Sequence, residues 1–198
     1  MNVLKPHVSK KTSVIFLVVI FFFCLSNNLK AQEITNQKTN KILIVYYTWS
    51  GHTQYIANYI QEILGCDILE INPVTPYPEE FKKCTEQAKQ EIKDGFKPEL
   101  VDFSIDIEDY DTIFIGSPNW WSSIAPPIAT LLTDYDFSGK TIIPFCTHGG
   151  GGKANLFTDM AKLVPDATIL EGIAILEGRA KLAKSEVEKW LKKIEILQ

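Results

Sequence analysis

The sequence predicts an α/β protein in which a five-stranded parallel sheet lies between two layers of helices. Apolar runs of strand length alternate with segments whose apolar residues recur at helical spacing, from residue 41 to the C-terminus. Parallel neighbours need crossover connections, and these are right-handed, so helices are expected on both faces of the sheet. We therefore expect one doubly wound domain over residues 41–198.

The first unit combines a buried strand with an amphipathic helix. Residues 41–47 form a continuous apolar run rich in β-branched and aromatic residues, which is typical of a strand buried on both faces. A helix over 53–64 places its apolar residues on one face, and Gly65 ends the pattern. Residues 67–71 predict the second strand.

The remaining segments repeat this alternation. Three further strands are predicted over 112–116, 141–145 and 168–175, and further helices over 77–94, 124–132, 155–163 and 180–197. Pro78 lies near the start of its helix and Gly95 stops it. Pro126 and Pro127 break the next helix early, and Gly172 interrupts the last strand.

The N-terminal segment has the features of a secretory signal. Lysines precede the apolar run 14–25, which is too short to span a bilayer comfortably, and Ala31 is a small residue suited to cleavage. We expect a signal peptide over 1–31, a flexible lead-in over 32–40, and a periplasmic or secreted protein with no stable membrane insertion after cleavage. An uncleaved N-terminal anchor is the alternative.

Charge and cysteine content exclude some classes of function. The signal holds four lysines and no acid, so its removal leaves 16 basic against 24 acidic residues, a net charge of −8. Such a surface argues against nucleic-acid binding. With Cys66, Cys84 and Cys146 but no CxxC motif, a metal site is not expected. One disulfide with a spare thiol and three free cysteines both stay open.

Ligands of doubly wound sheets bind beyond the carboxyl ends of the strands. The first candidate segment follows the first strand and comprises Thr48, Trp49, Ser50, Gly51, His52 and Thr53. A helix N-terminus offers N–H groups and a partial positive charge, so amides and hydroxyls together can hold a phosphate without lysine. Neither a Walker nor a Rossmann glycine pattern is present. Ordinary helix capping by a hydroxyl is the alternative.

Two more candidate segments follow the third and fourth strands. The second segment comprises Ser117, Pro118, Asn119, Trp120 and Trp121, and the third comprises Thr147, His148, Gly149 and Gly150. An exposed indole can stack on a flat aromatic ring, although one tryptophan could instead pack inward while the other marks a protein contact. The glycines let the backbone approach a ligand closely, or they form a hinge.

The succession KILIVYYTWSGHT, IFIGSPNWW and IIPFCTHGGGG resembles the flavodoxins and related flavodoxin-like oxidoreductases, in order and spacing, from about Lys41 to the C-terminus. The resemblance implies a three-layer sandwich with strand order 2-1-3-4-5 and FMN as cofactor. By this resemblance, the first segment holds the phosphate, the second flanks the isoalloxazine, and the third contacts its pyrimidine edge. No residue is assigned a catalytic role.

The resemblance implies an electron-transfer protein that exchanges electrons with a redox partner protein or a small quinone-like acceptor, and the N-terminal signal adds that it is exported. An NAD(P)H-dependent quinone or FMN reductase of the same fold is the first alternative. The only arginine, Arg179, lies in none of the three segments, which weighs against recognition of a nicotinamide nucleotide. A secreted interaction module without cofactor is the second alternative. Because the three segments lack Lys and Arg, the flavin is expected to have a lower potential than free FMN.

Overall fold

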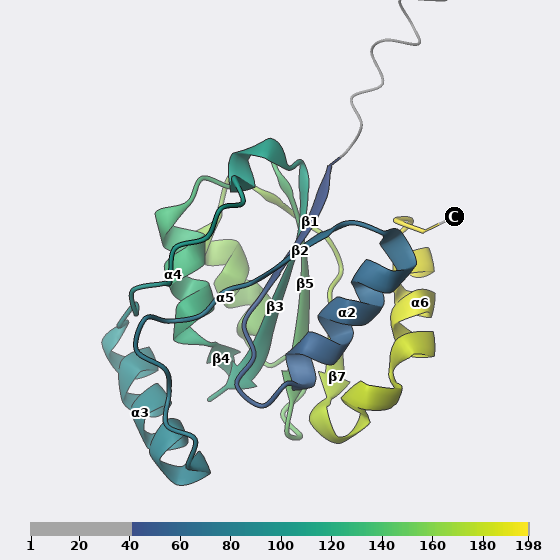
Figure 1. The fold of residues 1–198 in the computed structure, drawn as a ribbon. Helices are drawn as coiled ribbons and strands as arrows, with labels where there is room; N and C mark the ends of the chain where they lie inside the picture. Colours follow the sequence, from purple (N-terminus) through teal and green to yellow (C-terminus); the bar gives the residue numbers. More distant parts are fainter. Residues whose placement is uncertain (1–40, 198) are drawn as a thin grey trace, which may run out of the picture. The chain divides into compact units, whose positions relative to one another are not determined.

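A computed structural model describes residues 41–197 of the chain (Figure 1). Its strands are β1 (Ile42–Tyr46), β2 (Asp67–Glu70), β3 (Thr112–Trp120), β4 (Ser123–Ile124), β5 (Thr141–His148), β6 (Thr168–Ile169) and β7 (Ile173–Leu176). Its helices are α2 (His52–Leu64), α3 (Phe81–Asp94), α4 (Pro126–Asp134), α5 (Leu156–Leu163) and α6 (Lys184–Lys193), with short 3-10 helices η1 (Ile107–Asp109) and η2 (Glu177–Leu182). The predicted signal peptide and lead-in lie outside the described residues.

The sheet has the parallel order β2-β1-β3-β5-β6, and β7 also pairs with β5 in parallel. The predicted order 2-1-3-4-5 is confirmed, because β6 and β7 are the two halves of the fifth strand. They are separated at Gly172, where an added Cβ would lie 2.3 Å from the carbonyl oxygen of Pro144. Only a residue without a side chain fits this close approach.

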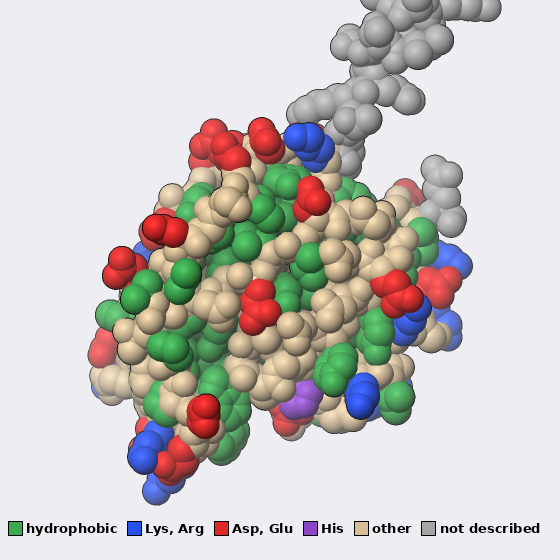
Figure 2. All heavy atoms as spheres, in the orientation of Figure 1, with side chains coloured by type: hydrophobic (Ala, Val, Ile, Leu, Met, Phe, Trp, Pro, Cys, Tyr) green, Lys and Arg blue, Asp and Glu red, His purple; other side chains and the backbone are tan. Residues whose placement is uncertain are grey.

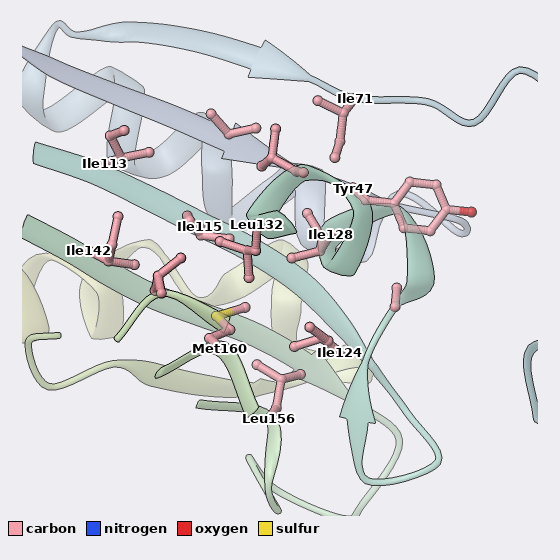
Figure 3. Packing of buried hydrophobic residues seen from close by; sticks show 14 of the residues in the cluster. Tyr47, Ile71, Ile113, Ile115, Ile124, Ile128, Leu132, Ile142, Leu156 and Met160 are labelled. Carbon is pink, nitrogen blue, oxygen red and sulfur yellow. The ribbon is translucent and has the colours of Figure 1, made fainter. Parts of the chain in front are cut away.

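The sheet is buried on both faces because successive strand residues point to opposite sides. On β1, Leu43 and Val45 belong to one apolar cluster, and Ile44 and Tyr46 belong to the other. Helices α4 and α5 cover the first face, and α2 and α6 cover the second (Figure 1). Figure 3 shows residues of β3 and β5 packed against α4 and α5.

Several predicted boundaries were wrong. The second site segment does not follow its strand but lies mostly within it, because β3 continues to Trp120, and the third segment begins inside β5. Pairing of Ser117 with Cys146 and of Pro118 with Thr147 extends the ladder between β3 and β5 into both segments. Beyond that point the short antiparallel strand β4, absent from the prediction, pairs with the end of β3.

The helix boundaries also differ at the N-terminal ends. Helix α3 begins at Phe81, four residues later than predicted, and η2 replaces the start of the last helix, so that α6 begins at Lys184. Pro126 and Pro127 do not break α4; they occupy its first positions, where a missing N–H has no effect on the helix. Among residues 41–197, no helix is long and apolar enough to cross a membrane.

Candidate functional site

A cavity of about 410 Å³ lies at the carboxyl ends of β1, β3 and β5. This volume lies within the range of small-molecule sites, about 300 to 1,000 Å³. The cavity brings together most of the predicted site residues, namely Trp49, Ser50, His52, Pro118, Asn119, Trp120, Trp121, Thr147, His148 and Gly149. The predicted residues that do not line it are Thr48, Gly51, Thr53, Ser117 and Gly150.

The first segment opens α2 without capping it. The N-cap is Gly51, in the left-handed region at φ 82°, and it has no side chain to cap the helix; within residues 41–197 no side-chain cap hydrogen bond is made there. The nearby hydroxyls have other partners: Thr48 Oγ1 accepts from the Gly51 amide at 3.0 Å, and Ser50 Oγ lies 2.8 Å from His52 Nδ1. The hydroxyls are therefore not ordinary helix caps. The N–H groups in the first turn of α2 stay available to bind a ligand.

Thr53 joins two of the predicted segments. Its side chain is buried, with 1% of its surface exposed, and its hydroxyl lies 2.9 Å from that of Thr147. This hydrogen bond ties the first turn of α2 to the end of β5. Thr53 thus holds Thr147, which lines the cavity, without lining the cavity itself.

Ser117 also has a structural role that the sequence did not reveal. The residue is fully buried, and its hydroxyl accepts a hydrogen bond from the Ala125 amide at 2.9 Å. The bond fixes the chain that enters α4 against β3. Ser117, which was expected to flank a bound ring, instead makes a hydrogen bond within the protein.

Asn119 links the second and third segments. Its side-chain amide donates to the carbonyl oxygen of Gly152 at 2.6 Å, and its side-chain oxygen accepts from the Ser122 amide at 3.0 Å. Trp121 and Ser122 form the turn between β3 and β4 with φ values of 52° and 68°, which is unusual for residues other than glycine. The Asn119 contacts hold this strained turn at the edge of the cavity.

The adjacent tryptophans have different environments. Trp120 packs edge-on against two tyrosines, with its ring centroid 5.7 Å from that of Tyr47 and 4.9 Å from that of Tyr77. Trp121 is 53% exposed and donates from Nε1 to the Thr85 carbonyl oxygen at 2.9 Å. Both line the cavity, although only Trp120 packs against the core, so this part of the inward-packing alternative is correct.

Sequence reasoning missed one wall of the cavity. Four residues of α3 line it, namely Phe81, Cys84, Thr85 and Ala88. Figure 2 shows hydrophobic side chains gathered on the side of α3 that faces the rest of the molecule. Phe81, Cys84 and Ala88 have the apolar spacing of a helix face, and nothing in such a stripe distinguishes a cavity wall from a packed face.

Glu177 is the other missed residue. It begins η2 directly after β7, and its Oε2 lies 4.0 Å from His52 Nδ1 at the cavity. Its position after the last strand was the available signal, because ligand sites lie at the carboxyl ends of strands. Among the described residues that line the cavity, Glu177 is the only carboxylate, and neither Lys nor Arg is present.

The cysteines give the site no reactive thiolate. Cys66, Cys84 and Cys146 are free, so the disulfide alternative was wrong. Burial disfavours the thiolate and raises the pKa of the Cys84 thiol, at the cavity wall, to about 11. Within residues 41–197, no group of His, Cys, Asp and Glu side chains could hold a metal ion.

A parallel sheet in this order, with its cavity where the central strands end at an uncapped helix, defines the class of flavodoxin-like α/β proteins. Comparison with known families agrees. The chain belongs to the flavodoxin family, whose sequence model matches residues 41–194.

Solved structures of similar proteins cover the same region. A flavoprotein from Lactobacillus acidophilus NCFM, crystallised in complex with FMN, is 30% identical over 77% of this chain and 99% of its own, with a TM-score of 0.60. A protein from Bacteroides eggerthii DSM 20697, provisionally named a flavoprotein, is 28% identical over 78% of this chain and 98% of its own, with a TM-score of 0.69. A search of curated proteins found no match.

Proposed function

We propose that the protein binds FMN in the cavity at the carboxyl ends of β1, β3 and β5. The observation that carries the proposal is the uncapped start of α2 at one end of a cavity lined by three tryptophans. Free N–H donors suit a phosphate, and indoles suit a flat aromatic ring. The FMN complex of the Lactobacillus acidophilus relative supports the same ligand.

Different residues would bind the two ends of FMN, the phosphate and the isoalloxazine ring. The first-turn amides of α2, with Ser50 and His52 beside them, would hold the phosphate. Trp49, Trp120 and Trp121 would flank the isoalloxazine, and the backbone near Gly149 would approach its polar edge. The flavin would supply the redox chemistry, and the protein would position it and exclude water.

Titration of the purified full chain with FMN, riboflavin and FAD tests this proposal. We expect saturable binding of FMN at one site, weaker binding of riboflavin because it lacks the phosphate, and a bound-flavin absorption spectrum. A protein that binds none of the three flavins would be a cofactor-free interaction module instead.

We further propose that the bound flavin carries electrons between a donor and either a partner protein or a small quinone-like acceptor. The cavity supports a carrier over an NAD(P)H-dependent enzyme, because the described residues that line it include no cation to recognise a nicotinamide nucleotide phosphate. Mixing the flavin-loaded protein with NADPH and a quinone separates the two: steady turnover would establish the reductase, whereas a carrier stays oxidised until a protein donor reduces it.

Export is proposed from the sequence of residues 1–31 alone. Cell fractionation and mass measurement of the native protein test it. We expect a chain that begins at Gln32 outside the cytoplasm, whereas an intact chain in the membrane fraction would establish the uncleaved anchor.

A further inference from the structure

The three tryptophans that line the cavity share one support. Trp49 lies just beyond β1, while Trp120 and Trp121 lie at the end of β3, yet all three contact the same distant stretch of chain. This stretch, residues 77–91, leads into α3 and includes most of that helix. We call it the clamp segment.

Trp49 is fixed at the start of the clamp segment. Its indole Nε1 donates to the Pro78 carbonyl oxygen at 3.1 Å, and its ring lies 6.2 Å from that of Phe81 at an interplanar angle of 53°. One directional bond and one ring contact together restrict the tilt of the indole.

Trp120 is fixed by a chain of contacts that ends inside α3. The Tyr77 ring meets it edge-on at 81°, and the Tyr77 hydroxyl donates to the carboxylate of Glu91. The second oxygen of Glu91 accepts from Gln87 Nε2 at 2.8 Å. Tyr77 is 6% exposed, and its burial together with the Glu91 bond raises its pKa, so the hydroxyl keeps the proton it donates.

Trp121 is fixed further along the same helix. Besides its bond to the Thr85 carbonyl oxygen, its ring lies 4.7 Å from Nζ of Lys89, within the range of a cation–π contact. These contacts hold a tryptophan at a positive φ that few residues adopt.

We propose that the clamp segment positions the three indoles for a flat aromatic ring, with Tyr77 and Glu91 as positioning residues. The inference rests on the proposed binding of FMN and adds that separate elements of the fold determine the binding of its ring and of its phosphate. The phosphate end belongs to a different element, α2. Loss of a clamp contact therefore weakens binding of the ring and leaves the contribution of the phosphate unchanged.

Comparing riboflavin with FMN separates the two ends, because the ligands share the ring and differ in the phosphate. In the full chain, Tyr77→Leu removes both the ring edge and the hydroxyl, and we expect it to weaken both ligands about 3- to 10-fold, so their affinity ratio stays constant. Tyr77→Phe and Glu91→Gln, which retain the packing, should give smaller losses in both. Ser50→Ala should change the ratio instead.

Gln90→Ala provides the matched control on α3. Gln90 is exposed, and among the described residues its side chain bonds to Asp94 alone, one turn further along, so both affinities should match those of the unaltered protein. If folded Tyr77→Leu and Glu91→Gln proteins bind both ligands normally, or lose FMN and keep riboflavin, the inference is wrong.

The aromatic circular dichroism of the ligand-free protein gives a readout that does not depend on flavin. Tyr77→Leu should change the tryptophan bands of this spectrum, to which tyrosine itself does not contribute, because Trp120 loses the ring that fixes its tilt. Tyr77→Phe, which keeps that ring, should change these bands less, and the helical signal should stay constant in both. An unaltered protein that binds no flavin would overturn the proposed function. Tryptophan bands that are the same in Tyr77→Leu as in the unaltered protein would overturn the clamp itself.

Discussion

Ser50 and Thr53 differ in what surrounds their hydroxyls. Ser50 is exposed at the cavity and its hydroxyl lies within hydrogen-bond distance of the His52 ring, whereas Thr53 is buried and bonded to Thr147. A phosphate at the start of α2 would hydrogen-bond directly to Ser50. Thr53 would act mainly by keeping the first turn of α2 against β5.

Replacing Ser50 and Thr53 together by alanine should weaken FMN binding about 10- to 100-fold, since a hydrogen bond to a charged group is worth about 1.5 to 3 kcal/mol. Riboflavin affinity should change little. Calorimetric titration with both ligands measures the difference. Thr133→Ala is a matched control, because that hydroxyl bonds only within α4. Unchanged FMN affinity in the double variant would show that the phosphate does not bind at the start of α2.

Glu177 places a negative charge beside the proposed flavin site. A carboxylate there disfavours the negative charge that a flavin gains on reduction, so the bound potential should lie below that of free FMN. Glu177→Gln should raise the potential. Glu108→Gln should leave the potential unchanged, because Glu108 lies in η1 before β3, at the amino ends of the strands. A spectroelectrochemical titration of the three proteins decides, and equal potentials for the unaltered protein and the Glu177→Gln variant would contradict this role.

At the level of elements, the pairing of β3 with β1 and β5 depends on a single glycine, Gly116, which lies opposite Tyr46 and Phe145. An added Cβ on Gly116 would lie 2.2 Å from Cζ of Phe145 and 2.8 Å from Cβ of Tyr46. Contacts this short force neighbouring side chains or backbone to move. The packing of Tyr46 and Phe145 on this face of the sheet consequently leaves no room for a side chain at position 116.

Gly116→Ala should lower the free energy of unfolding by about 1 to 3 kcal/mol or more, because overpacking strains a filled core. Urea unfolding measures the loss. Gly178→Ala is the control, since a Cβ there meets nothing within 4 Å and its φ is not in the left-handed region. Partial recovery in the Gly116→Ala, Phe145→Leu double variant would confirm the clash, and equal stability of the two single variants would exclude it.

The strands and both helix layers followed from the sequence because each buried strand is a continuous apolar run, whereas the strand order came from the resemblance to the flavodoxins. The chain 41–47, for example, has apolar residues for both faces and no competing helical spacing. The start of α3 was less predictable: Pro78 is compatible with a first helical turn, but its carbonyl oxygen is instead used by Trp49. That contact joins residues 29 positions apart, which local patterns do not encode.

The candidate site likewise combines features that the topology determines with features that depend on distant contacts. Residues of all three segments line one cavity because the topology alone brings the carboxyl ends of these strands together. The roles of Ser117 and Thr53 depend on Ala125 and Thr147, partners supplied by other parts of the fold. A hydroxyl beside a ligand and a hydroxyl bonded inside the protein look identical in the sequence.

At the level of the whole molecule, several tyrosine hydroxyls favour the protonated form in the folded state. Burial first, then a hydrogen bond to Glu70, raises the pKa of Tyr46 to about 12 from 10.0. The bond to Asp67, more than burial, raises the pKa of Tyr110 to about 12. Unfolding would return both groups to ordinary values.

The protein should therefore lose stability at alkaline pH. The unfolded chain releases the Tyr46 proton near pH 10.0, before the folded protein does near pH 12, so this contribution is complete below pH 10.0 and falls as pH rises toward 12. Urea midpoints between pH 9 and 12 should decline, and less steeply in Tyr46→Phe. A constant midpoint over that interval would show that the hydroxyls stay solvated when folded.

The distribution of tryptophans gives the protein an optical gauge of its own state. Three of the four indoles surround the cavity, while Trp190 packs against Phe114 on the other face of the sheet. Flavins absorb where indoles emit, so ligand uptake should quench the intrinsic fluorescence, chiefly through the three near indoles. Trp190→Phe should retain most of the quenching amplitude and Trp120→Phe should lose a larger part. Cavity occupancy could then be followed without a label, in real time, even where the bound flavin itself does not fluoresce.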